Sequence, residues 1–115
     1  MSEMVSRAID RCLRIMDLVG SMSPNELPKK MASEIGARLQ KVVHLLRGFE
    51  KTASLKTRMG REAAQDIEEA AINLERTLGN LGSSDPSPVM ESLLALEQRV
   101  EALQKAIEKL KRMVT

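Results

Sequence analysis

The 115-residue sequence predicts an all-α protein, an antiparallel four-helix bundle that forms a single domain over residues 1–115. Ala, Leu, Glu, Lys, Arg and Met dominate a chain with one aromatic residue, Phe49, and no segment alternates apolar and polar residues as a strand would. Four segments instead repeat apolar residues at helical spacing, and the connections between them are mostly short. Short connections favour an up-down-up-down arrangement.

The first helix is expected over residues 4–20, where Gly20 offers a stop. Its apolar residues recur three and four apart and predict one inner face, formed by Val5, Ala8, Ile9, Cys12, Leu13, Met16 and Val19. A turn with two prolines follows at residues 23–28. Asn25 is expected to cap the second helix, which places Pro28 at its third position, where the missing N–H breaks no helical hydrogen bond.

The second helix is expected over residues 26–53 and the third over residues 58–81. The inner face of the second is predicted to hold Met31, Ile35, Leu39, Val42, Leu46, Phe49 and Ala53. The third is predicted to turn inward Ala63, Ile67, Ala70, Ala71, Leu74, Leu78 and Leu81, with alanines that let a neighbouring backbone approach closely. Only weak breakers separate the two segments, so one continuous helix is an open alternative.

The fourth helix is expected over residues 88–114, after a serine- and proline-rich loop, with Ser87 as its N-cap. Its apolar residues are spaced four then three apart, the heptad of a coiled coil: Val89, Leu93, Leu96, Val100, Leu103, Ile107, Leu110 and Val114. This seam must be covered by other helices. Ala106 and Met113 widen the apolar stripe and favour coverage within the bundle. The β-branched residues at a and the leucines at d favour a homodimer through this helix.

The cysteine content and the distribution of charge limit the functions that the chain can have. Cys12 is the only cysteine, so no intramolecular disulfide forms and a cytoplasmic location is expected. No segment approaches the length of a membrane span, and no membrane contact is expected.

Residues 1–61 hold 12 Lys or Arg against 6 Asp or Glu, and residues 62–115 hold 6 against 10. The simplest interpretation is that the helices neutralise one another where they pack, and the alternative is a basic docking surface.

His44 is the one residue that supports a chemical hypothesis. On a helical wheel it lies about 180° from the apolar seam of the second helix, so its side chain is expected to face solvent. Ala37 and Gly48 fall on the same outer face, and the cations around them are Lys41, Arg47 and Lys51. This uncrowded surface is expected to let a partner approach the imidazole closely.

The segment His44-Leu45-Leu46-Arg47-Gly48 resembles the His-x-Leu-Lys-Gly signature of histidine-containing phosphotransfer domains, with Arg47 in place of lysine. That family is a four-helix bundle of about this size, with its histidine on the exposed face of a helix. The resemblance implies that His44 takes a phosphoryl group from the aspartyl phosphate of a response-regulator receiver domain. It also implies that the nearby cation offsets phosphate charge, that Gly48 leaves room for the receiver, and that the receiver supplies the metal.

Other chemical classes find less support. A buried, inert thiol is expected at Cys12, and His44 has no second histidine or cysteine at helical spacing, so neither a zinc site nor a cofactor is expected. The acidic cluster of Glu62, Asp66, Glu68 and Glu69 is expected to be a solvated face. Nucleic-acid binding by the arginines of the first helix is not expected, because Asp10 and Asp17 interrupt that cluster and aromatic side chains for base stacking are lacking.

The sequence therefore predicts a cytoplasmic, non-enzymatic helical bundle that works by binding other proteins. The residues expected at the partner surface are Ala37, Lys41, Arg47, Gly48 and Lys51. Phosphoryl relay through His44, between receiver domains, is the specific alternative.

Overall fold

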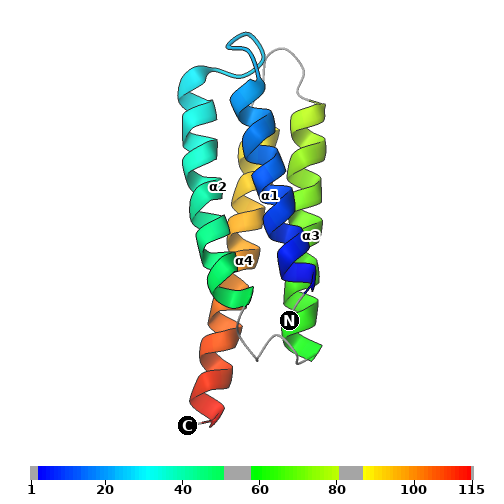
Figure 1. Cartoon of the computed structure of the whole chain (residues 1–115), viewed down its shortest axis with the longest axis vertical. Helices are drawn as coiled ribbons and strands as arrows, with labels where there is room; N and C mark the ends of the chain where they lie inside the picture. Colours follow the sequence, from blue (N-terminus) through cyan, green and yellow to red (C-terminus); the bar gives the residue numbers. More distant parts are fainter. Residues whose placement is uncertain (1–2, 51–57, 81–86, 115) are drawn as a thin grey trace.

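A computed structural model describes residues 3–50, 58–80 and 87–114, and within these ranges the chain forms helices and no strand. The helices are α1 (Glu3–Ser21), α2 (Lys29–Glu50), α3 (Arg58–Gly79) and α4 (Ser87–Val114). They form an elongated bundle with extents of 52 × 20 × 19 Å (Figure 1). The predicted all-α, four-helix class is confirmed.

Consecutive helices run in opposite directions along the bundle (Figure 1). The alternative of one continuous rod through the second and third segments is therefore wrong, because α2 and α3 are antiparallel helices. α1 packs against α2 and α3, whereas α4 packs against α3 and less extensively against α2. The pairs α1–α4 and α2–α3 thus lie across the bundle from each other. Two of the neighbouring pairs, α1–α3 and α2–α4, are parallel.

The connection before α2 is a closed turn. The N–H groups of Glu26 and Leu27 both donate to the carbonyl of Ser23, at 2.9 and 3.0 Å. The Glu26 carboxylate in return accepts from the Ser23 N–H at 3.1 Å and from its hydroxyl at 3.2 Å. Leu27 is buried and ties this turn to the core.

This turn shifts the start of α2 from the expected position. Asn25 lies inside the turn and does not cap the helix, because the turn closes on the Ser23 carbonyl. Pro28 precedes the first helical residue, Lys29, and its carbonyl accepts from the Ala32 N–H at 2.9 Å. Pro28 is therefore not the third residue of the helix, and α2 begins three residues later than the predicted start at residue 26.

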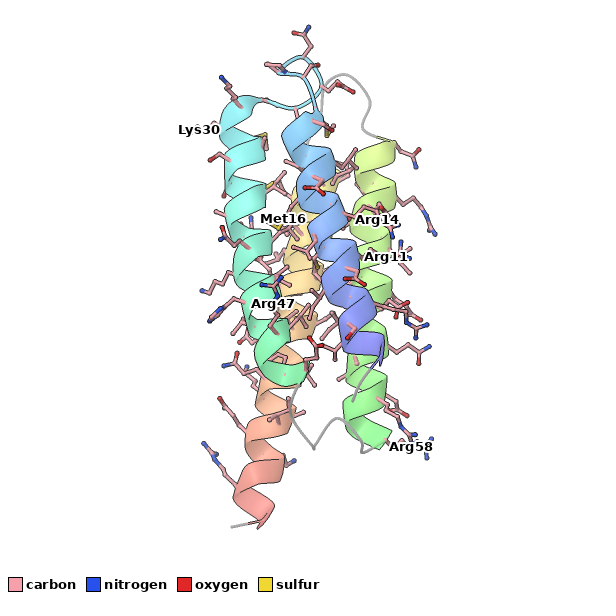
Figure 2. The ribbon with its side chains drawn as sticks, viewed as in Figure 1. Arg11, Arg14, Met16, Lys30, Arg47 and Arg58 are labelled. Carbon is pink, nitrogen blue, oxygen red and sulfur yellow. The ribbon has the colours of Figure 1, made fainter. Side chains whose placement is uncertain are left out.

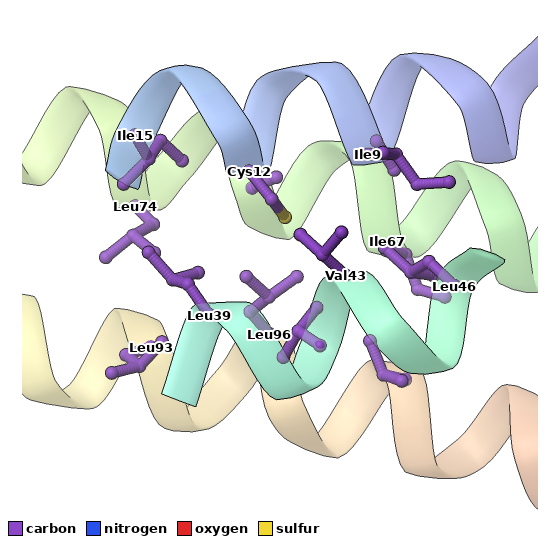
Figure 3. Close-up of a cluster of buried hydrophobic side chains, with 14 of the residues drawn as sticks. Ile9, Cys12, Ile15, Leu39, Val43, Leu46, Ile67, Leu74, Leu93 and Leu96 are labelled. Atoms are coloured by element: carbon purple, nitrogen blue, oxygen red, sulfur yellow. The ribbon is translucent and has the colours of Figure 1, made fainter. Parts of the chain in front are cut away.

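The heptad seam of α4 is buried, as its spacing predicts. Its described side chains are at most 5% exposed: Val89, Leu93, Leu96, Val100, Leu103 and Ile107. The side chains of Leu110 and Val114 lie outside the described part of the chain. Leu93 and Leu96 contribute to the core beside Leu39 of α2 and Leu74 of α3 (Figure 3). In this structure the other helices of the same chain cover the seam.

The inner face of α1 is rotated from the predicted one. Ile15 is fully buried although it was not expected inside, whereas Leu13 is 36% exposed and Met16 is only partly buried. The buried stripe continues through Cys12 to Ile15 and Val19 at spacings of three and four, because α1 must face both α2 and α3.

The inner faces of α2 and α3 are close to the predicted ones. Ile35, Leu39, Val42 and Leu46 of α2 are buried, as are Ile67, Ala71, Leu74 and Leu78 of α3. The sequence pattern missed Val43 and Ala64, which are also buried. Met31, Phe49, Ala63 and Ala70 are only partly buried. Ala53 and Leu81 lie outside the described residues.

Ion pairs join the basic first half of the chain to the acidic second half. Arg7 pairs with Glu68 at 3.3 Å and Arg11 with Glu75 at 2.8 Å, both between α1 and α3. Arg38 of α2 pairs with Glu97 of α4. The interpretation that the helices neutralise one another where they pack is confirmed at these positions. Within the described ranges, no helix combines the length and apolarity needed to cross a lipid bilayer.

Exchanging Leu103 for lysine tests whether the seam of α4 is covered within the chain. Leu103 is fully buried, whereas Leu94 on the same helix is 49% exposed and serves as the matched control. We expect Leu103→Lys to lower the free energy of unfolding by more than about 4 kcal/mol, because it buries an ammonium group without a partner. Leu94→Lys should change it by less than about 0.5 kcal/mol. Urea unfolding followed by circular dichroism measures both.

Sedimentation of the same variants separates the bundle from the zipper. A wild-type dimer that Leu103→Lys converts into folded monomers would show that the seam joins two chains, contrary to the arrangement described above.

Candidate functional site

The outer face of α2 carries the histidine that the sequence singles out. His44 is exposed, as its position on the helical wheel predicts, and so are Ala37, Lys41, Arg47 and Gly48. Lys51, also expected there, lies outside the described residues. Charged side chains project from the outer surface of the bundle (Figure 2).

A groove runs between α2 and α4, the adjacent pair that makes the least extensive contact. It consists of two hollows of about 320 and 300 Å³ that share Leu45 and Gln104 as lining residues. The first hollow is lined from α2 by Arg38, Lys41 and Val42, and from α4 by Glu97, Val100 and Glu101. The second is lined from α2 by His44, Gly48 and Phe49, and from α4 by Ile107 and Glu108. We call the two hollows together the α2–α4 groove.

The groove brings together only part of the predicted surface. Lys41, His44 and Gly48 line it, whereas Ala37 and Arg47 are exposed on α2 but are not among its lining residues. Three of the residues predicted for the partner surface and its histidine thus line the α2 side of the groove, and two lie outside it.

The floor of the groove is apolar. Val42, Val100 and Ile107 are buried core residues, and Leu45 and Phe49 are partly buried above them. Because Leu45 and Phe49 are not fully covered by the bundle, they retain apolar surface that a partner can bury.

The two walls of the groove carry opposite charge. α2 contributes the cations Arg38 and Lys41, whereas α4 contributes the carboxylates Glu97, Glu101 and Glu108. The sequence pattern did not single out the α4 wall, because all the residues predicted for the partner surface lie on the second helix. The available signal was a second stripe beside the heptad seam, because Glu97, Glu101, Gln104 and Glu108 are spaced four, three and four residues apart.

An ion pair bridges the groove at its Arg38 end. The Arg38 Nε donates to Glu97 Oε2 at 2.9 Å, and a second guanidinium N–H donates to Glu97 Oε1. Glu34, one turn before Arg38, adds a longer contact at 3.8 Å. The hydrogen bonds that Arg38 donates to Glu97 raise the pKa of Arg38; burial partly offsets this rise, and the charges of Glu97 and Glu34 reinforce it. The pair links the α2 and α4 walls of the groove directly.

Gly48 has no evident structural reason to be glycine. Apart from its chain neighbours and the backbone of its own helix, a Cβ built at this position meets no atom within 4 Å, and no described glycine has a positive φ angle. Glycine inside a helix costs about 1 kcal/mol relative to alanine, so Gly48 destabilises α2 without relieving strain or crowding. What it provides is open surface beside His44.

The other reactive groups in the described part of the chain form no candidate site. Cys12 is buried, and burial raises the pKa of its thiol to about 12, so the thiolate needed for reactivity is not formed near neutral pH. Among the described residues, no three His, Cys, Asp or Glu side chains cluster so as to hold a metal ion. Within the expected acidic face, Glu62 and Asp66 face Arg58 and Arg99 in exposed ion pairs.

Comparison with protein-family models, curated proteins and solved structures finds no match for this chain. A fold of this kind serves many functions, so the function must be argued from the residues of the groove.

A double-mutant cycle measures how strongly the Arg38–Glu97 pair couples α2 to α4. We expect Arg38→Met and Glu97→Gln each to lower the free energy of unfolding by about 1 kcal/mol, with a coupling energy of about 0.5–1 kcal/mol. This coupling energy is modest because the Arg38 and Glu97 side chains are both more than a quarter exposed, at 27% and 29%. The coupling should shrink as NaCl rises from about 0.1 M to about 1 M.

The exposed pair Arg58–Glu62, at successive turns of α3, is the control for this cycle. Its coupling should not exceed about 0.5 kcal/mol. Equal coupling for the two pairs would contradict a specific role for Arg38–Glu97 in joining the helices.

Proposed function

We propose that this chain is a non-enzymatic protein-binding module and that the α2–α4 groove is its docking surface. The observation that carries the proposal is the incomplete contact between α2 and α4, which leaves Leu45 and Phe49 partly uncovered between two charged walls. An apolar strip with a charged rim is the composition of a protein interface.

The dimensions of the groove also favour a macromolecular partner. Along α2 it extends from Arg38 to Phe49, which is about 16 Å at ~1.5 Å per residue. A long, shallow surface between two helices suits a row of side chains from a partner better than it encloses a small molecule.

Site-specific photo-crosslinking tests the docking surface in cells that express the protein. A photoreactive residue replacing Lys41 or Gln104 should form adducts with a partner, because both positions line the groove. The same residue replacing Arg14, exposed on α1, is the control and should form few or none. Adducts that are equally abundant at position 14, or confined to it, would place the docking surface elsewhere.

Phosphoryl transfer through His44 is the second candidate. It is favoured by the exposure of the imidazole together with the open surface at Gly48 and the exposed cations Lys41 and Arg47. Phe49 occupies the position after the glycine where the phosphotransfer family has a small residue, and Ser54 stands in place of a second glycine. These departures put this candidate behind protein binding.

The chemistry of this second candidate is a single displacement at phosphorus. A nitrogen of the His44 imidazole attacks the phosphorus of an aspartyl phosphate on the receiver domain, and an N–P bond forms. The P–O bond to the receiver breaks, and its carboxylate leaves as an anion. Lys41 and Arg47 then offset part of the negative charge of the phosphoryl group, and the receiver supplies the metal ion.

Incubation with a phosphorylated receiver domain decides between these candidates. Relay predicts acid-labile phosphate on the wild type and at least a hundredfold less on His44→Gln, since glutamine cannot form the N–P bond. Protein binding alone predicts no label on either protein and unchanged crosslinking in His44→Gln. The relay proposal fails if the wild type stays unlabelled or if His44→Gln is labelled equally.

A further inference from the structure

We infer that the partner presents to the α2–α4 groove a single amphipathic α-helix, with acidic residues along the edge that faces α2 and basic residues along the edge that faces α4. This inference rests on the proposed docking surface and adds the secondary structure and the charge pattern of the partner segment.

The first step is the secondary structure of the partner. Both walls of the groove are helices, whose central backbone N–H and C=O groups are already hydrogen-bonded within each helix. They offer no free backbone edge to which an extended segment could add as a strand. Recognition must therefore proceed through side chains, and a third helix packs naturally along the valley between two parallel helices.

The second step is the apolar anchor. Leu45 and Phe49, one turn apart on α2, present partly uncovered apolar surface along the groove. A partner helix covers such a strip with apolar residues at positions i, i+3 or i+4, and i+7. Beside Phe49, Gly48 has no side chain, and apart from its chain neighbours and its own helix backbone no atom lies within 4 Å of where a Cβ would be. A bulky partner side chain can settle there.

The third step is the charge pattern. Arg38 and Glu97 already neutralise each other at one end of the groove. Beyond this pair, Lys41 lines the α2 side opposite Glu101, and Glu108 lines the α4 side of the hollow that holds His44. Glu101 has an exposed contact with Lys105 one turn away, a class of pair that contributes little. The groove thus attracts a helix whose two edges differ in the sign of their charge.

A displayed library of amphipathic helices tests this inference without a known partner. The library keeps an apolar stripe constant and varies both flanking stripes among Glu, Lys and Gln. It is selected on the full-length protein and counter-selected on Leu45→Glu, with Gly48→Gln as a second groove variant should Leu45→Glu not fold. We expect the enriched helices to carry Glu on one flank and Lys on the other.

Charge reversal on the protein then tests the orientation of the helix. The best selected peptide should bind at least about tenfold more tightly than the same peptide with its flanks exchanged. The double variant Lys41→Glu, Glu101→Lys should reverse that preference. The control variant Arg14→Glu, Glu69→Lys changes exposed charges on α1 and α3 and should leave the preference unchanged. Fluorescence anisotropy of labelled peptides measures each affinity.

The outcomes separate this inference from the proposed docking surface. Selected helices that need Leu45 but show no flank preference would overturn the charge pattern and leave the docking surface standing. Selected helices that bind Leu45→Glu and Gly48→Gln as well as wild type, or no enrichment at all, would overturn both.

Self-association is the remaining outcome. A wild-type dimer that Lys41→Glu dissociates and that the added Glu101→Lys restores, seen by sedimentation, would identify a second copy of this chain as the occupant. That result would overturn the inferred partner helix.

Discussion

The rest of the bundle depends on one constraint, which is that the apolar seam of α4 must be covered on both sides. The seam is buried from Val89 to Ile107, and the helices that pack against α4 are α3 and α2. Each buried leucine or valine contributes roughly 1.5–3 kcal/mol relative to an exposed one, so an arrangement that leaves the seam open is strongly disfavoured. α1 takes the remaining corner, across the bundle from α4 and against both other helices.

Covering α4 in this way also determines which helices are parallel. Since consecutive helices alternate in direction, the pairs α2–α4 and α1–α3 each run the same way (Figure 1). The Arg–Glu ion pairs between helices join these same parallel pairs: Arg7–Glu68 and Arg11–Glu75 join α1 to α3, and Arg38–Glu97 joins α2 to α4. The antiparallel pair α3–α4 has an exposed Asp66–Arg99 ion pair. At its interface it also has a polar contact, where Ser92 lies 3.1 Å from the Thr77 hydroxyl and accepts from Asn73 at 3.3 Å. The α2–α4 pair packs least extensively, and the groove follows from that.

The features that follow from the spacing of residues along one helix were mostly predictable from the sequence, whereas the choice of which helices pack side by side was not. The burial of the α4 seam from Val89 to Ile107 and the exposure of His44 follow from the periodicity of their own helices, and both are confirmed. On α1, the same spacing is compatible with Leu13 or Ile15 inside, and the choice depends on where α2 and α3 lie. Glu108 is a candidate site residue because α4 lies beside α2 and brings it into the hollow that holds His44. The spacing of residues along α4 does not indicate which helix lies beside it.

The two functional proposals compete for one surface, and the acidic wall distinguishes them. A helix seated on Leu45 and Phe49 would cover His44, whereas phosphoryl transfer needs an open path to the imidazole. Gly48 is compatible with a partner helix and with a receiver domain alike, because the absence of a side chain only leaves space for either. Glu108 disfavours phosphoryl transfer, since it lines the same hollow as His44 and its carboxylate repels an incoming phosphoryl group. The same carboxylate attracts a basic edge of a partner helix. The opposition of charge across the groove therefore favours protein binding over phosphoryl transfer.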